Sequence, residues 1–182
     1  MKTIETSGKQ YELYWSCGIV EGGTSKNMET RVHGSGGGSN GYGNTAPVNI
    51  SSTTTIHDQF FLKDKKGKES SFQLQDFNVA CREGNELSVI WAIKKGGKTG
   101  PYIVVHNRTT SGTFFQEAEL KKIFRYPAYY PLGATILLLI LGNMIGYGLA
   151  FMLIIAAWVA WFYLGNKEVK KFKSEINFNE FV

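Results

Sequence analysis

The chain has 182 residues, of which 43% are hydrophobic and 19% are charged, and its formal net charge is +5. This length excludes a large multidomain enzyme, and the ordinary apolar fraction excludes a chain that is disordered throughout. With only 2 cysteines, the chain cannot build a disulfide framework.

Residues 1–114 are predicted to form a cytoplasmic domain made mainly of β-strands, because the first ten residues lack the apolar core of a signal peptide. Six or seven short segments rich in aromatic and β-branched residues are separated by turn signals at intervals of about 8–12 residues. The segments are Gln10–Val20, Met28–His33, Val48–His57, Gln59–Lys63, Phe72–Cys81, Glu86–Lys94 and Tyr102–Asn107. This pattern predicts a small barrel or a sandwich.

A glycine-rich loop over residues 34–44 interrupts the strands. Its low complexity predicts a flexible loop, and it lacks the lysine and the following helix that a phosphate-binding P-loop needs. A G-x-S-x-G pattern within it lacks the flanking strand and helix of a nucleophile elbow. As a candidate contact surface for a partner, the loop offers Gly36, Gly37, Gly38 and Tyr42.

Residues 115–125 are predicted to form a short helical connector that leads into a membrane. Good helix formers fill this segment, and Glu117 and Lys121 have the i,i+4 spacing of a favourable pair.

Residues 126–164 are predicted to form a transmembrane helical hairpin. No charged residue occurs between Arg125 and Lys167, and the run from Pro131 to Leu164 has 34 residues, whereas one span needs about 20. Small and polar residues near 142–148 supply a turn between two short helices. The alternative is a buried helical hairpin in a soluble protein.

The charges that flank this run predict its topology. Residues 1–120 carry 13 Lys+Arg and 12 Asp+Glu, a net of +1, whereas residues 121–182 carry 7 and 3, a net of +4. Basic residues beside a span stay on the cytoplasmic side, and they occur on both flanks, so an even number of crossings is expected. The membrane-flanking basic residues are Lys121, Lys122, Arg125, Lys167, Lys170, Lys171 and Lys173. Residues 165–182 then form a cytoplasmic amphipathic tail.

Small residues in the hairpin permit close helix packing. Gly142 and Gly146, and likewise Ala156 and Ala160, are spaced four residues apart. They pack either the two helices of one hairpin or the helices of different chains, and the sequence leaves both readings open. The hairpin itself has no Asp, Glu, Lys, Arg or His, which argues against a transporter made of one chain.

No catalytic, cofactor-binding or metal-binding site is expected. The three histidines and two cysteines lack the close pairs in sequence that are typical of zinc sites. Cys81 lies in a strand that ends in a turn, a context that does not favour a nucleophile.

These features together predict an integral membrane protein of the bacterial inner membrane with both termini in the cytoplasm. The expected partners are the lipid bilayer, further copies of the chain in a homo-oligomer, and a protein that binds the β domain. Nucleic acid is not expected, because the β domain is nearly neutral. We expect a non-enzymatic interaction or scaffolding role; the alternative is a ligand-sensing β-barrel, for example for a nucleotide, coupled to the hairpin.

Overall fold

The computed structural model of the chain describes residues 1–38, 41 and 47–181. The chain divides into two compact units, each of which is described by itself. The first unit comprises Met1–Cys17, Ser88–His106 and the chain from Phe115 onward. The second unit comprises Gly18–Leu87 and Asn107–Phe114.

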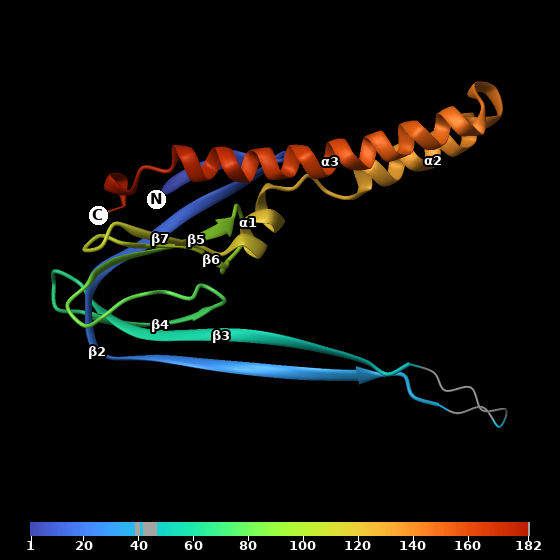
Figure 1. Cartoon of the computed structure of the whole chain (residues 1–182). Coiled ribbons are helices and arrows are strands. Elements are labelled where there is room, and N and C mark those ends of the chain that lie inside the picture. Colours follow the sequence, from blue (N-terminus) through green and yellow to red (C-terminus); the bar gives the residue numbers. More distant parts are fainter. Residues whose placement is uncertain (39–40, 42–46, 182) are drawn as a thin grey trace. The chain divides into compact units, whose positions relative to one another are not determined.

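Seven strands make up the β structure that the structure describes (Figure 1). They are β1 (Lys2–Thr6), β2 (Lys9–Ser35), β3 (Asn49–Lys63), β4 (Glu69–Gln75), β5 (Glu86–Lys94), β6 (Tyr102–Asn107) and β7 (Gly112–Phe115). Their order is β4-β3-β2-β5-β6-β7, with β1 paired to β2, and the sheet is open. The expected β-rich domain is therefore confirmed, and the expected barrel is wrong.

The physical reason for an open sheet lies in its end strands and in what covers one of its faces. β4 has 7 residues and β7 has only 4, so the ends of the strand order offer little backbone for closure. In the first unit, helices and the C-terminal segment bury the apolar face of the sheet, which a barrel would bury by closing on itself.

β2 is longer than the sequence pattern suggests, because two expected strands are joined into one. It has 27 residues, and its antiparallel pairing with β3 shifts register between Glu21 and Ser25. Gly22 adopts a φ of +76° at this bulge, a conformation that favours glycine. Beyond the bulge, β2 and β3 continue as a long two-stranded ribbon (Figure 1).

β4 ends earlier than expected. The segment Phe72–Cys81 alternates like a strand, but β4 stops at Gln75 because Asp76 and Asn78 adopt φ values of +59° and +51°. These are the residue types that tolerate the left-handed region best after glycine. The Asp76 carboxylate accepts a hydrogen bond from the Ile56 amide at 3.0 Å, which fixes the turn.

The first unit has a core between its strands and the C-terminal half of the chain. Helix α1 (Glu117–Phe124) confirms the expected helix in the connector, and it buries Leu120, Ile123 and Phe124 at i, i+3 and i+4. They cluster with strand residues Tyr11, Leu13, Ile90, Ala92, Ile103 and Val104 and with Val169 and Phe181 from the end of the chain.

The second unit has an apolar core of its own. Its buried side chains are Val20, Phe60, Leu62, Phe72, Leu74, Phe77, Val79 and Leu87. The rings of Phe60 and Phe72, on the paired strands β3 and β4, lie 5.9 Å apart in a stacked arrangement.

The uncharged run forms two helices in the first unit, α2 (Tyr129–Ile145) and α3 (Tyr147–Glu175). The expected break between them falls at Gly146, whose φ of +88° no other residue type adopts easily. α3 is long and apolar enough to cross a membrane, whereas α2 reaches that length only together with α1, from which it is bent by 55°. α3 does not end at Leu164 as expected but continues for another eleven residues (165–175).

Candidate functional site

The two apolar helices contact each other through hydrogen bonds from two tryptophans. Trp158 donates from Nε1 to Thr135 Oγ1 at 3.1 Å, and Trp161 donates from Nε1 to the Tyr126 carbonyl at 2.8 Å. The first bond joins the first half of α2 to the apolar part of α3, and the second joins the segment just before α2 to the end of that part, so the two helices lie side by side (Figure 1). The ends of the uncharged run that carry the basic flanks therefore lie together.

An apolar groove of about 440 Å³ lies between α2 and α3 at this end. Its lining includes the aromatic residues Tyr126, Tyr130 and Trp161 together with small and aliphatic side chains. Of the expected packing residues, Ala160 lines the groove and Ala156 is exposed.

The two glycines expected to permit packing lie at the break between the helices. Gly142 is buried, and a Cβ added there would lie 2.8 Å from Cδ1 of Tyr147. Gly146 forms the break, and nothing lies within 4 Å of a Cβ there. Gly142 thus permits close approach of the Tyr147 ring, five residues further along the chain.

Beside the polar end of α3 lies a second pocket, of about 540 Å³, which we call the basic pocket. Its lining residues are Glu117, Lys121, Tyr163, Asn166, Lys167, Val169, Lys170 and Lys173. Lys173 forms an ion pair with Glu117, which joins α3 to α1. Four lysines against one glutamate leave three positive charges uncompensated within the pocket.

The seven membrane-flanking basic residues thus separate into those inside and those outside this pocket. Lys121, Lys167, Lys170 and Lys173 line it. Lys122 pairs with Glu119 at 2.5 Å, and Lys171 is exposed outside the lining.

Arg125 ties the end of α1 to α3. Its guanidinium carbon lies 4.7 Å from the ring centre of Phe162 and 5.4 Å from that of Trp161, within the range of cation–π contacts. Its Nε is buried and has no hydrogen-bond partner among the residues that the structure describes. α3 presents Gly165 to this side chain, since a Cβ there would lie 2.7 Å from Cγ of Arg125.

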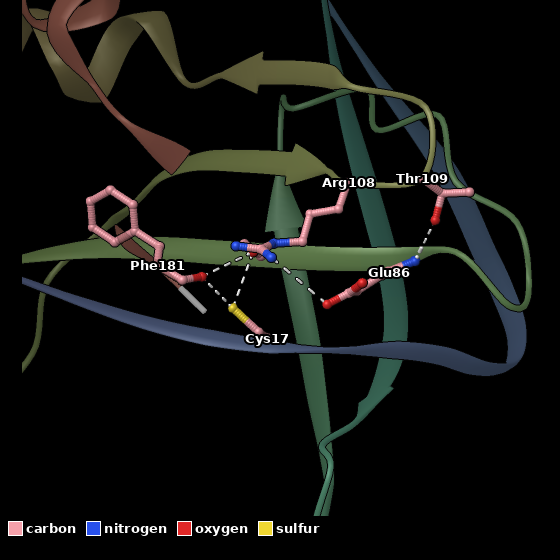
Figure 2. Close-up of polar contacts among 6 residues, drawn as sticks. Cys17, Glu86, Arg108, Thr109 and Phe181 are labelled. Atoms are coloured by element: carbon pink, nitrogen blue, oxygen red, sulfur yellow. Dashed lines mark hydrogen bonds and ion pairs between the residues drawn. The ribbon is translucent and has the colours of Figure 1, made fainter. Parts of the chain in front are cut away.

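The C-terminal segment packs on the sheet of the first unit. Phe181 is 1% exposed, and its ring meets the Trp15 ring edge-on at 5.2 Å. The Cys17 thiol donates to the Phe181 carbonyl at 2.6 Å (Figure 2). Ser88 Oγ donates to the same oxygen at 3.3 Å. Phe178 stacks on His106 at 4.1 Å. The chain after α3 is therefore held by the β-sheet.

A polar cluster in the second unit holds β5 to the chain that follows β6. Arg108 Nη1 lies 3.9 Å from a carboxylate oxygen of Glu86, and the Glu86 amide donates to Thr109 Oγ1 at 2.9 Å (Figure 2). The buried amide of Asn107 donates to the Ala80 carbonyl at 3.2 Å and to Asn85 Oδ1 at 3.1 Å. These contacts give the polar groups at this turn their hydrogen-bond partners, so the role of the cluster is structural.

The candidate contact loop is described only in part. Gly36, Gly37 and Gly38 are exposed, and Tyr42 lies outside the described residues. Gly36 has a φ of +99°, and a Cβ there would lie 2.3 Å from the Pro47 carbonyl oxygen, so this position requires glycine.

Within the described ranges, no group of three or more His, Cys, Asp and Glu side chains could hold a metal ion. Cys81 is half-buried, and this burial raises the pKa of its thiol, with a smaller contribution from the Asp58 carboxylate. A raised pKa lowers the thiolate fraction, which makes Cys81 a poor nucleophile.

The comparisons with known proteins leave the site to be interpreted from its own geometry. No family model, no curated protein and no solved structure matches the chain.

Sequence reasoning found the lysines but not how they group. Residues 167, 170 and 173 recur every three positions on one helix, but Lys171 is four residues from Lys167 and so lies close to it on the same helix, and the spacing alone does not separate it from the others. Glu117 and Asn166 had no such signal, because their role depends on how α1 packs against α3.

Proposed function

We propose that this chain is a membrane-anchored, non-enzymatic interaction or scaffolding protein. In this proposal α2 and the apolar part of α3 cross a membrane as a hairpin, and both termini and the β-sheet lie on the cytoplasmic side. The observation that carries the anchor is the exposed, uncharged surface of the two helices, which ends at lysines on both flanks.

Exposed apolar side chains on these helices are numerous enough to need a covering medium. Ile136, Ile140, Phe151 and Val159 are each more than 60% exposed. Leaving such a side chain in water instead of burying it costs about 1.5–3 kcal/mol. A lipid bilayer removes this cost for every exposed position of both helices at once.

The lengths of the two apolar segments match each other. α2 has 17 residues and is about 25 Å long, and Tyr147–Leu164 of α3 is about 27 Å long. Both are close to the hydrocarbon thickness of about 30 Å, and a small shortfall is accommodated by local thinning.

The side-by-side arrangement favours an even number of crossings. Trp161 bonds to Tyr126, and Arg125 packs against Gly165, so both basic flanks leave the helices at one end. The tyrosines and tryptophans at that end suit the level of the lipid headgroups. A hairpin keeps all seven basic residues on the cytoplasmic side, in agreement with the positive-inside rule.

The ribbon of β2 and β3 supplies a surface for protein partners. Met28, Val32 and Ile50 are exposed on it, and among the described residues β4 pairs with His57–Lys63 of β3 and not with Asn49–Ile56. An exposed strand pair with apolar side chains is a frequent site of strand-mediated association. We infer that this ribbon contacts other proteins, including further copies of the chain. The sensing alternative depends on the mouth of a barrel, and the open sheet removes that support.

Reporter fusions test the anchor. A reporter active only outside the cytoplasm is fused after Val182 in the full chain and, as a matched control, after Gly146 in a chain that ends at the break. We expect activity only for the fusion after Gly146. Activity for the fusion after Val182 would contradict the hairpin.

Light scattering of the detergent-solubilised chain tests self-association. We expect a mass of at least two chains after subtraction of the detergent. A monomer at micromolar concentration would contradict the homo-oligomer and would leave the anchor unaffected.

A further inference from the structure

The basic pocket combines features that a single surface lysine lacks. Three of its lysines come from one face of α3, and Lys121 reaches it from α1. Glu117 forms its ion pair with Lys173 and so neutralises the charge of that lysine. Within the part of the chain that the structure describes, Lys121, Lys167 and Lys170 have no ion-pair partner, so the pocket attracts an anion.

The volume and lining of the pocket indicate more than a bare ion. A volume of about 540 Å³ lies within the range of about 300–1,000 Å³ that holds small organic ligands. Asn166 and Tyr163 add hydrogen-bonding groups beside the lysines. Lysine ammonium groups bind phosphate as point charges, and hydroxyl or amide groups can bind the polar remainder of a headgroup.

The position of the pocket selects the source of the phosphate. Lys167 follows the last apolar residue, Leu164, by less than one helical turn, or about 5 Å along the axis. If α3 spans the membrane, the pocket opens at the depth of the lipid phosphates on the cytoplasmic side.

We propose that the basic pocket binds the phosphate-bearing headgroup of an anionic phospholipid. This proposal rests on the membrane anchor proposed above. The bound headgroup bridges α1 and α3 and so fixes the β-sheet of the first unit close to the membrane surface.

Lipid titration of the detergent-solubilised full chain tests the proposal, with native mass spectrometry to count bound lipid. The probes are phosphatidylglycerol and phosphatidylcholine with equal acyl chains, and soluble glycerol 3-phosphate. Lys167→Gln/Lys170→Gln removes two pocket lysines. Lys122→Gln/Lys171→Gln is the matched control, because it removes the same charge at two positions outside the pocket.

We expect phosphatidylglycerol to bind the wild type and the control in preference to phosphatidylcholine. The pocket variant is expected to bind phosphatidylglycerol about thirtyfold more weakly, since each lysine near an anionic headgroup contributes about 1 kcal/mol. Equal weakening in both double variants would overturn the pocket, because it would show a general charge effect. Binding of glycerol 3-phosphate as strong as that of the lipid would overturn the lipid source.

The reporter fusions make failure of this proposal distinguishable from failure of the anchor. If the fusions confirm the hairpin but the protein binds phosphatidylglycerol no more strongly than phosphatidylcholine, only the headgroup site is wrong. If the fusion after Val182 is active, the anchor is wrong whatever the lipid titration shows.

Discussion

Replacement of Phe181 by alanine tests whether the C-terminal segment holds α3 to the β-sheet. The side chain is 1% exposed and lies in the cluster that joins the sheet, α1 and the end of α3. Phe→Ala in a core costs about 3–5 kcal/mol through lost transfer energy and the cavity left behind. The edge-on contact with Trp15 contributes to that loss.

The expected loss is a large part of the total stability of an ordinary domain, which is about 5–15 kcal/mol. For a chain of this size it corresponds to a fall of roughly 6–20 °C in Tm. Thermal unfolding of the detergent-solubilised protein, followed by near-ultraviolet circular dichroism, measures it. Phe181→Leu retains most of the volume and is expected to lose less than about 2 kcal/mol.

Phe151→Ala is the matched control, because this phenylalanine is 64% exposed on α3 and contributes little to the core. A Tm for Phe181→Ala within 2 °C of that of the control would refute the reasoning. It would show that the segment after α3 contributes nothing to the stability of the sheet.

Two further predictions concern Arg125 and Cys81. Gly165→Leu is expected to destabilise the detergent-solubilised chain by about 1–3 kcal/mol, because its Cβ would meet Arg125 Cγ; Gly148→Leu, on the same helix with open space around it, is the control, and equal effects would contradict a contact at Gly165. Burial, and to a lesser degree Asp58, raises the pKa of Cys81 above its unfolded value, so the associated stability is complete below the unfolded pKa and is lost as the pH rises through the folded pKa. Urea unfolding from pH 7 to 10 should therefore show a steeper loss for the wild type than for Cys81→Ser, and parallel curves would contradict this.

The turn at residues 64–67 shows what local sequence can predict. Asp64 accepts hydrogen bonds from the amides of Lys66 and Lys68 at 2.8 and 2.9 Å, and Gly67 adopts a φ of +81°. These bonds are local, and the one from Lys68 is the main cause that lowers the pKa of Asp64. Side chain and glycine together specify the turn without help from distant residues.

The extent of the strands could not be predicted in the same way. Alternation continues past Gln75, yet Asp76 and Asn78 leave the extended region because their turn bonds to the distant β3. Conversely, Gly22 looks like the end of a strand but forms a bulge within β2. In both cases pairing with another strand decides where the strand ends, and the local sequence pattern does not indicate that pairing.

The candidate site was predictable to the extent that it depends on charge and periodicity. The uncharged run and its seven basic neighbours are visible in the sequence, and so is a turn near 142–148, within which the break at Gly146 falls. The grouping of Lys121 with the α3 lysines depends on the packing of α1 beside α3, and the pairing of Gly165 with Arg125 depends on the same contact. The sequence around a glycine in a helix does not indicate which distant residue will contact it.

The central claim is that the break between α2 and α3 lies on the opposite side of the membrane from the rest of the chain. Labelling of single cysteines by a membrane-impermeant maleimide tests it in intact cells of a bacterial expression host. The background carries Cys81→Ser and Cys17→Ser, and the serine at position 17 retains a donor for the Phe181 carbonyl. Met144→Cys reports on the break, where Met144 is 83% exposed, and Ser174→Cys reports on the exposed end of α3.

The hairpin predicts that Met144→Cys is labelled in intact cells and that Ser174→Cys is labelled only after the cells are lysed. Labelling of Ser174→Cys in intact cells, or protection of Met144→Cys until lysis, would contradict it.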